Sequence, residues 1–461
     1  MDDAALSVLL SRIQFAVTIA FHYIFPPLNI GLGLLLVAME GFWIKTGKPV
    51  YRQLARFWAL AFGLMFALGV ASGVVMEFQF GTNWSNYSRY VGDVFGSALA
   101  AEGIFAFFLE SGFLGLVLFG WDRVRPKVHY LATILVALGA HFSAIWIVVA
   151  NSWQQTPSGF REVVRDGVKR AEVTNFWEVV FSPSSLDRIS HVFSGAWLGG
   201  AFFVLSVSAF YLLRNRHVEF AKAGMKIALI VAAGGSLLQL ATGHKSGVTV
   251  AEYQPVKLAA YEAHFETSPA GMWLFGIPDT EARTVRYGVY MPGMLSLLAK
   301  GDSQAPIQGL LDVEPGLWPP VGVVFQTYHA MVAIGMFLIV LSWVGVLLWW
   351  RGTLFEKRWL LWIFVFAVLG PVLANELGWF SAEIGRQPWA VQGYLKTADS
   401  GSPAVPSSHV ILSLIGFGVI YALLLALFIY LLNEKIQHGP DDPLLQTQGE
   451  VAGIVKEEHR A

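Results

Sequence analysis

The sequence predicts an all-α integral membrane protein with nine transmembrane helices. Of its 461 residues, 55% are hydrophobic and only 14% are charged, and the mean hydropathy is +0.55, which is typical of polytopic membrane proteins. Nine apolar segments are about 20 residues long or longer, enough to cross a hydrocarbon core of roughly 30 Å as helices. These segments are residues 13–38, 56–77, 95–119, 129–150, 189–213, 222–243, 322–349, 358–380 and 408–432.

Charge and cysteine content exclude several classes of protein. The formal net charge of −1 gives no basic field that would favour a nucleic acid. The chain has no cysteine, so disulfides, iron–sulfur clusters, thiolate-bound copper and Cys-linked haem are excluded. Histidine, methionine and carboxylates remain as ligands for any metal centre.

The first apolar segment is predicted to stay in the mature protein, because it is too long for a signal peptide and is interrupted by His22 and Pro26-Pro27. Lys and Arg concentrate in the connections after the first, third, fifth and seventh segments, which places these connections in the cytoplasm. The N-terminus is therefore predicted outside and the C-terminus inside. The connection 151–188 is an exception, with cations on the predicted outer side.

The domain organisation predicted is one transmembrane domain, residues 1–436, followed by a polar cytoplasmic tail, 437–461. The longest connection, 244–321, lies outside and lacks a spanning pattern. A connection of this length in a compact protein is usually functional or disordered.

The candidate functional residues are polar or thioether side chains at membrane depth, where a charge costs at least about 2.5 kcal/mol. Most converge on the outer half of the spans, with one acid deeper: His22, Glu102, Glu110, His191, Met331 and Glu376. Taken singly, each also has a structural interpretation, as an interhelical hydrogen bond, as core packing or, for Glu376, as an ion pair with Arg386. The other histidines near span ends or in loops are expected to be solvated, namely His129, His217, His244, His264, His409, His438 and His459.

Taken together, these side chains suit haem binding. An imidazole and a thioether on two helices at similar depth would suit the axial positions of a low-spin haem. A single His or carboxylate ligand would leave an open face on a further iron, as oxygen activation requires. His329 lies two residues from Met331, hence about 200° round a helix, so both cannot face the same iron.

Glu102 and Glu110 are eight residues apart, about 80° round a regular α-helix and roughly 12 Å along it. This spacing suits successive stations of a proton path better than a joint metal site. The alternative is that each acid bonds to a neighbouring helix as a structural contact.

Five stretches in order resemble subunit I of the cytochrome bd-type quinol oxidases, in the class with a short quinol loop. The resemblance covers the chain to about residue 432, and the stretches are Ser11–Phe15 with His22, Met76–Trp84, Glu102–Ser111, Phe119–Arg123 and Gly385–Trp389. It implies a quinol:oxygen oxidoreductase that uses ubiquinol or menaquinol, reduces dioxygen to water and builds a proton motive force without pumping.

The resemblance also implies three haems. His191 and Met331 match the axial pair of a low-spin haem b, and His22 and Glu376 match the ligands of a high-spin haem b and a haem d, or a haem b in its place. With Glu376 as an iron ligand, Arg386 is expected to hold haem propionates.

The remaining implications concern protons, quinol and partners. Glu102 matches an acid beside the oxygen-reducing haem and Glu110 an acid on the proton route, while Lys257 and Glu262 match the quinol-binding part of the outer loop. The implied fold has two four-helix bundles and a peripheral ninth helix, in the bacterial cytoplasmic (inner) membrane. Its expected partner is a second large subunit, subunit II; small accessory subunits stay an open question.

One departure is His329, where the family pattern often has Arg. Two alternative functions stay open. One is a dihaem quinone-linked electron carrier without oxygen chemistry. The other is a proton-coupled transporter, which the lack of similarity between the two halves disfavours.

Overall fold

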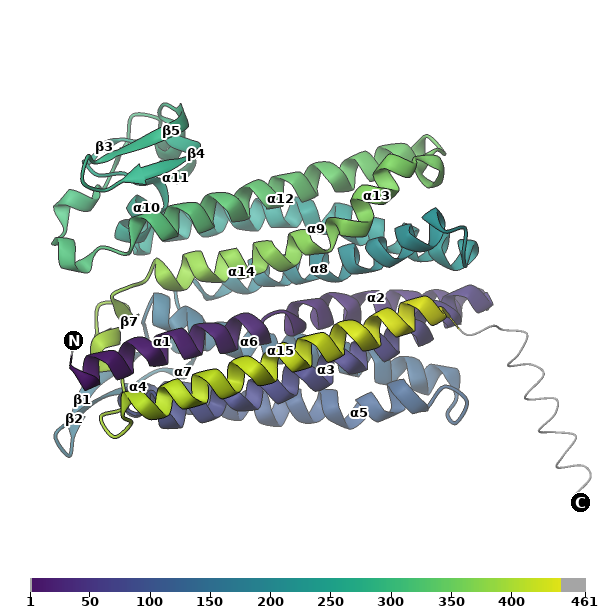
Figure 1. Ribbon diagram of the computed structural model, residues 1–461, viewed down its shortest axis with the longest axis horizontal. Helices are drawn as coiled ribbons and strands as arrows, with labels where there is room; N and C mark the ends of the chain where they lie inside the picture. Colours follow the sequence, from purple (N-terminus) through teal and green to yellow (C-terminus); the bar gives the residue numbers. More distant parts are fainter. Residues whose placement is uncertain (1, 441–461) are drawn as a thin grey trace, which may run out of the picture.

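The computed structural model describes residues 2–440 and is built of long helices that run side by side, with short helices and strand pairs at one end (Figure 1). Within the described residues, eight helical segments are long and apolar enough to cross a membrane. They are α1–α2 (Asp3–His22 and Phe25–Thr46), α3 (Pro49–Thr82), α6 (Pro126–Gln155), α8 (Ser185–Leu213), α9 (Val218–Tyr253), α12 (Val321–Trp350), α13–α14 (Arg358–Ala367 and Leu369–Ile384) and α15 (Ser407–His438).

Eight of the nine predicted spans coincide with these segments. The predicted span 95–119 is helical as well, but it is divided into α4 (Ser85–Glu102), a π-helical turn (Gly103–Phe107) and α5 (Phe108–Phe119). Because of this division, it is not among the eight. Of the predicted tail, residues 441–461 lie outside the described part of the chain.

Two of the spans are broken close to candidate ligands. The first span breaks between α1 and α2 immediately after His22, where Pro26 and Pro27 lack the N–H groups that would continue the helix. The span α13–α14 breaks at Val368, three residues before Pro371. His22 thus lies immediately before the first break, and Glu376 lies about two helical turns after the second.

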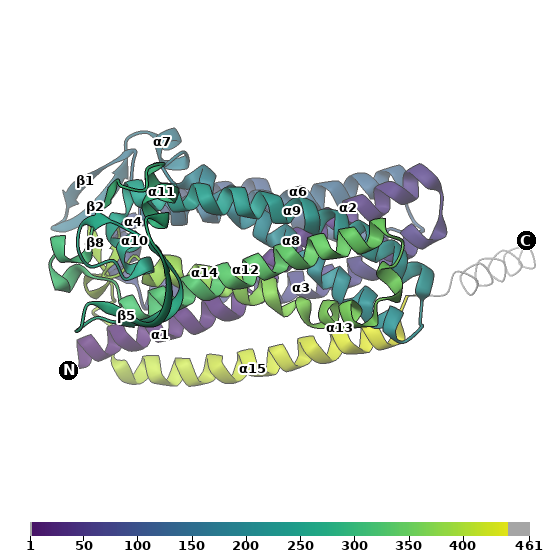
Figure 2. The ribbon, with the colours of Figure 1, turned by 90° about the horizontal axis from the view of Figure 1, so that it is seen from above.

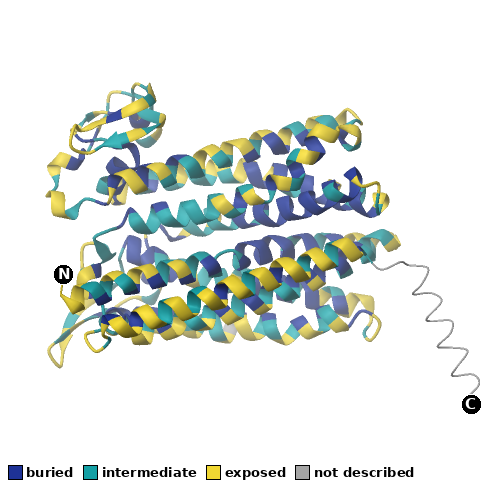
Figure 3. Ribbon diagram, viewed as in Figure 1, coloured by how far each residue is buried: buried dark blue, intermediate teal, exposed yellow. Residues whose placement is uncertain are grey.

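Helix α8 is the centre of the bundle. In its most apolar stretch 83% of the residues are buried, against 11% for α15, which lies at the periphery; Figure 2 shows α15 along one side of the molecule. Buried residues are dense along α8 and α2 in the half near the C-terminal end (Figure 3). Gly31 and Gly200 let α2 and α8 meet, since a Cβ on Gly31 would lie 2.7 Å from the Gly200 nitrogen.

The helices pack in two neighbouring groups. Helix α2 packs on α3 and on α6, and α3 and α6 both pack on the α4–α5 segment, whereas α8, α9, α12, α13 and α14 form the other set of contacts. The two groups meet where α8 contacts α2 and α6 and where α9 contacts α2 and α3. Helix α15 packs mainly on α1.

The connections gather at the two ends of the bundle. The end that holds the N-terminus carries the hairpin of β1 (Phe160–Arg165) and β2 (Val168–Val173), α7 (Phe176–Val180), and the pair of β7 (Trp389–Val391) and β8 (Leu395–Lys396). The longest connection lies there too, with α10 (Pro255–Glu262), β3 (Ser268–Pro269), β4 (Met272–Asp279), β5 (Thr284–Met291), α11 (Met294–Lys300) and β6 (Pro306–Ile307). Because α9 continues to Tyr253, this connection begins at Gln254 and not at the predicted residue 244.

Candidate active site

His22 and His191 are held in the same way. The Nδ1 atom of His22 lies 3.0 Å from the Ser72 hydroxyl of α3, and that hydroxyl donates to the Leu68 carbonyl. The Nδ1 atom of His191 lies 3.1 Å from the Thr242 hydroxyl of α9, which donates to its own helix at Leu238.

Each hydroxyl therefore has its single proton engaged and can only accept from the imidazole. The proton of each ring is fixed on Nδ1, and the lone pair is on Nε2. This is the tautomer in which a metal-binding histidine is usually held, with the second nitrogen donating to a neighbouring group. The side chain of Gln239 lies 3.2 Å from Nε2 of His191.

Met331 in α12 faces α14. A Cβ built on Gly378 would lie 2.8 Å from the Met331 sulfur, so the glycine leaves the space that the thioether fills. His329 points elsewhere: its Nε2 lies 2.8 Å from the Trp273 carbonyl and its Nδ1 lies 2.9 Å from the Phe325 carbonyl. The different surroundings of His329 and Met331 agree with their predicted separation round the helix.

Glu376 in α14 has a carboxylate that lacks hydrogen bonds in the described part of the chain. Both of its carboxylate oxygens are buried, and neither has a hydrogen-bond partner among the described residues. An unpaired buried polar group costs about 1–3 kcal/mol, and more when it is charged. The carboxylate lies close enough to Tyr23, the neighbour of His22, to act on it electrostatically. A ferric ion bound here would offset the cost of burying the charge.

The alternative that Glu376 pairs with Arg386 is wrong. Arg386 forms its ion pair with Glu383. Glu383 also accepts hydrogen bonds from Asn151, at 2.9 Å, and from Gln155, at 3.0 Å. The Nε and Nη1 atoms of Arg386 are buried without a described partner, so the guanidinium keeps donors for another anion.

This cluster contains residues that the sequence analysis missed. Arg188, Asn151, Gln155 and Glu383 were not among the candidates, yet Arg188 donates to Asn151 and connects α8 to the cluster. Arg188 is one helical turn before His191, and Glu383 is three residues before Arg386. Those spacings are the sequence signals that point to both residues.

Lys257 and Glu262 share α10 but belong to different networks. Lys257, only 3% exposed, donates to Gln155 and, at 3.0 Å, to Gln254. Burial lowers its pKa well below the usual value, with Arg188 acting in the same direction.

Glu262 faces the β4 strand. Its Oε2 accepts from the Trp273 N–H at 3.1 Å and lies 3.7 Å from His329, while its Oε1 is buried without a described partner. Burial raises the pKa of Glu262 to about 8, although the Trp273 hydrogen bond opposes the shift.

Glu102 and Glu110 both face α6. The Ser143 hydroxyl donates to Glu102 at 2.5 Å, and a Cβ on Gly139 would lie 2.9 Å from the Glu110 backbone nitrogen and Cβ. Ser143 and Gly139 are one turn apart on α6. The offset of about 80° expected for a regular α-helix is reduced because residues of the intervening π-helical turn rotate the chain less.

His129 contradicts the expectation of a solvated side chain. It is 1% exposed and lies between α6 and α2, with its Nδ1 atom 2.7 Å from Glu40. His217 and His264 are also partly enclosed rather than fully solvated. His459 lies outside the described residues.

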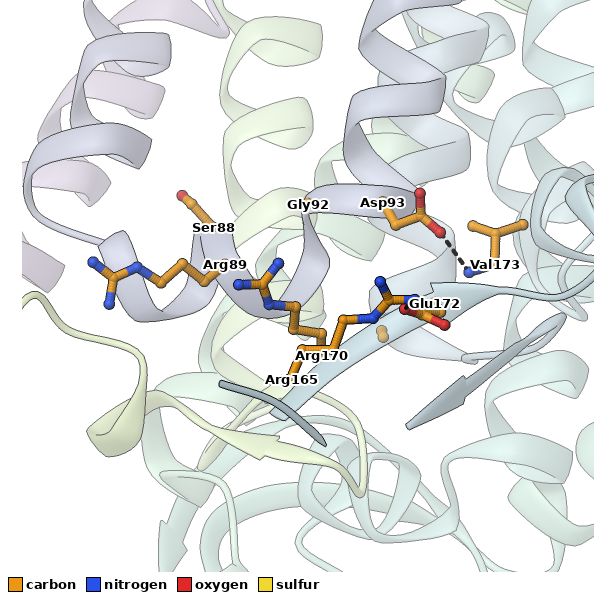
Figure 4. A pocket seen from close by; sticks show the side chains of 9 residues that line it. Ser88, Arg89, Gly92, Asp93, Arg165, Arg170, Glu172 and Val173 are labelled. Atoms are coloured by element: carbon orange, nitrogen blue, oxygen red, sulfur yellow. Dashed lines mark hydrogen bonds and ion pairs between the residues drawn. The ribbon is translucent and has the colours of Figure 1, made fainter. Parts of the chain in front are cut away.

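A separate pocket of about 700 Å³ lies at the β1–β2 hairpin. Figure 4 shows Arg89 and Asp93 of α4 on one side and Arg165, Arg170 and Glu172 of the β1–β2 hairpin on the other. The Asp93 carboxylate accepts from the Val173 N–H at 2.7 Å. The pocket shares none of its lining residues with the candidate site.

Comparisons with known proteins agree with this arrangement. Residues 10–440 match the family model described as cytochrome bd terminal oxidase subunit I. Cytochrome bd ubiquinol oxidase subunit 1 of Bacillus subtilis (strain 168) is 39% identical over 94% of both chains. Cytochrome bd-II ubiquinol oxidase subunit 1 of Escherichia coli (strain K12) is 35% identical, over 94% of this chain and 96% of that one.

A solved structure has the same fold. The structure of bd oxidase from Geobacillus thermodenitrificans contains a chain that superposes with a TM-score of 0.87 at 32% identity, covering 95% of this chain and all of that one. The family model matches nearly the whole chain, and both relatives are more than 30% identical to it. The chain belongs to the cytochrome bd terminal oxidase subunit I family.

Proposed function

We propose that the chain is the haem- and quinol-binding subunit of a terminal oxidase that oxidises quinol at the outer membrane face and reduces dioxygen to water. The activity is that of a quinol oxidase, as the names of the relatives in Bacillus subtilis and Escherichia coli indicate. The observation that carries the proposal is the carboxylate of Glu376, buried without a partner in the described chain.

The residues present fit haem. His191 and Met331 would hold a low-spin haem b, and His22 and Glu376 would hold the active-site pair, a high-spin haem b and a haem d or a haem b in its place. When bound, these three haems supply the iron that accepts electrons from quinol and delivers them to dioxygen. The fixed Nδ1–H tautomers of both histidines support the assignment, and the two unpartnered donors of Arg386 suit propionates.

Quinol would bind beside α10, where its oxidation releases protons to the outer side. Glu262 can accept such a proton, because its raised pKa of about 8 makes it a stronger base than an ordinary carboxylate. The ammonium or amine of Lys257 can hold a quinol oxygen, since Gln155 and Gln254 fix the position of its nitrogen.

Protons for water formation would come from the cytoplasm through Glu110 and Glu102. Both acids face α6, and the Ser143 hydroxyl at Glu102 is a further group that can exchange a proton. Uptake from one side and release on the other separates charge and builds a proton motive force. No pumping of additional protons is needed.

The fold supports a placement in the membrane. We infer nine spans, counting the π-interrupted segment Ser85–Phe119 as one, arranged as two four-helix bundles with α15 as the peripheral ninth helix. Residues 1–436 would form this single domain in the bacterial cytoplasmic membrane, with the N-terminus outside. The partner would be subunit II, as the name subunit 1 of the relatives suggests.

Absorbance spectra of the purified complex, oxidised, reduced and reduced with carbon monoxide, test the function. The proposal predicts several haems, of which at least one binds carbon monoxide. A spectrum without any haem would favour the proton-coupled transporter. Haem that does not bind carbon monoxide would favour the dihaem quinone-linked carrier.

A further inference from the structure

We propose that the buried cluster of Glu40, His129 and Thr133 is the station that takes up protons from the cytoplasmic side for Glu110. This inference rests on the proposed function, in which Glu110 and Glu102 carry protons for water formation. It assigns a role to three residues that the function does not otherwise use.

The cluster joins α2 to α6 inside the bundle. His129 Nδ1 lies 2.7 Å from Glu40 Oε1, and the Thr133 hydroxyl donates to Glu40 Oε2 at 2.6 Å. Glu40 and His129 are each 1% exposed. The Trp121 ring packs against the imidazole at a centroid distance of 4.0 Å, which holds the ring in place.

One atom of the cluster has no hydrogen-bond partner among residues 2–440. His129 Nε2 is buried, and no described residue makes a hydrogen bond to it. An imidazole with one nitrogen on a carboxylate and the other free can receive a proton on the free atom and release one from the bonded atom. A proton that binds to Nε2 would let the Nδ1 proton pass to the Glu40 carboxylate. The imidazole would thus gain one proton and lose one.

Stability alone is a poor reason for such a cluster. Replacing both members of a buried hydrogen bond by apolar side chains of the same shape can be nearly neutral or stabilising, because the burial of polar groups is costly. Further along the same interface, α2 and α6 make a close apolar contact, because a Cβ on Gly33 would lie 3.4 Å from the Ala137 Cβ. Stability therefore does not explain the acid and the histidine at this interface, whereas proton transfer uses both.

The position of the cluster suits proton uptake. His129 is three residues from Pro126, the first residue of α6, and Glu40 is six residues from Thr46, the last of α2. At 1.5 Å per residue, these side chains are about 5 and 9 Å from the helix ends that face the predicted cytoplasm.

Helix α6 connects the cluster to the two acids. His129 and Ser143, which bonds Glu102, are fourteen residues apart and therefore within about 40° of each other round the helix. Thr133 is about 9 Å along the axis from Gly139, which contacts Glu110. Leu114, Val117 and Val136 belong to the apolar core, so the proposed transfer across this interval needs a water that enters between apolar side chains.

The test compares variants of the complete membrane complex. Glu40→Gln and His129→Asn should lower steady-state oxygen reduction about tenfold or more, the range for loss of a proton-transfer group, and should raise the solvent deuterium isotope effect. Haem content and the anaerobic reduction of the haems by quinol should stay normal. Glu40→Asp should restore most of the rate, because it keeps the carboxylate.

Two further variants separate proton transfer from a structural role. Thr133→Val keeps the contact between His129 and Glu40 and removes one hydrogen bond, and should slow oxygen reduction less than Glu40→Gln does. Ser206→Ala removes an interhelical hydrogen bond to Val365 of 2.6 Å between α8 and α13, and should leave the rate and the isotope effect unchanged.

Two results would overturn the inference. The first is a normal rate per haem in Glu40→Gln and His129→Asn while Glu110→Gln is slow, whether or not the melting temperature falls. The cluster would then have a structural role only, and the proposed proton path through Glu110 would stand. The other is a normal rate in all three variants, including Glu110→Gln, in which case the proposed path itself fails.

Discussion

Arg386 forms its ion pair with Glu383, the residue three positions before it, at the C-terminal end of α14. Both side chains are largely buried, and Arg188 lies close enough to stabilise the same carboxylate. Glu383 holds α14 against α6 through Asn151 and Gln155. Because Arg386 pairs with Glu383, Glu376 has no cationic partner among the described residues.

Glu383→Gln should destabilise the complex by about 3 kcal/mol, because removing one member of a buried ion pair leaves the other charge uncompensated. Thermal unfolding of the purified complex measures the loss. Glu172→Gln is the matched control, since its partners Arg161 and Arg165 are mostly exposed and such pairs contribute about 1 kcal/mol or less. Equal effects of the two substitutions would contradict the structural role of Glu383.

His191→Ala or Met331→Leu should remove the low-spin haem signal, because each takes away one of the two proposed axial ligands. The optical spectrum of the reduced protein reports the result. Met336→Leu is the control, since Met336 lies in the same helix and is 48% exposed. An unchanged haem b spectrum in both ligand variants would refute the assignment.

Lys257→Ala or Glu262→Ala should raise the apparent KM for quinol and leave carbon monoxide binding to the reduced haems intact. Steady-state kinetics and carbon monoxide titration measure the two properties. Loss of both in equal measure would argue against a quinol role for α10.

The pH dependence provides a sharper version of this test. Glu262 accepts a proton only when it is ionised, and burial raises its pKa to about 8. The kcat/KM for quinol should therefore rise with pH up to about 8, and Glu262→Gln should flatten this rise. A rise that persists unchanged in the variant would show that another group titrates.

Glu110→Gln should slow oxygen reduction without loss of haem, because the amide cannot carry a proton. Turnover per haem separates this effect from damage to the fold. Loss of haem at normal turnover of the remaining enzyme would instead identify Glu110 as a structural acid.

The membrane spans could be predicted because hydrocarbon imposes a length and a composition on each helix. The limits of the helices could not, since hydropathy detects burial in lipid and not helical backbone. Helix α9 continues through His244 and Lys245 to Tyr253, beyond the apolar segment. The π-helical turn after Glu102 has no proline or other sequence mark, so the alignment of Glu102 with Glu110 appears only in the structure.

The candidate site could be predicted in part for the same reason. Glu376 stands out in an apolar segment, whereas Glu383 and Arg188 lie near span ends where charges are ordinary. His129 lies three residues inside α6, and its partner Glu40 is 89 positions away. Only the packing of α2 on α6 brings the two together and buries both.

The most direct test of the central claim, that Glu376 is an iron ligand, is the haem content of Glu376→Gln. Reduced and carbon monoxide-difference spectra of the purified complex should show one active-site haem fewer per chain, with the low-spin signal of the His191 and Met331 site retained. An unchanged haem content and an unchanged carbon monoxide spectrum would contradict the account.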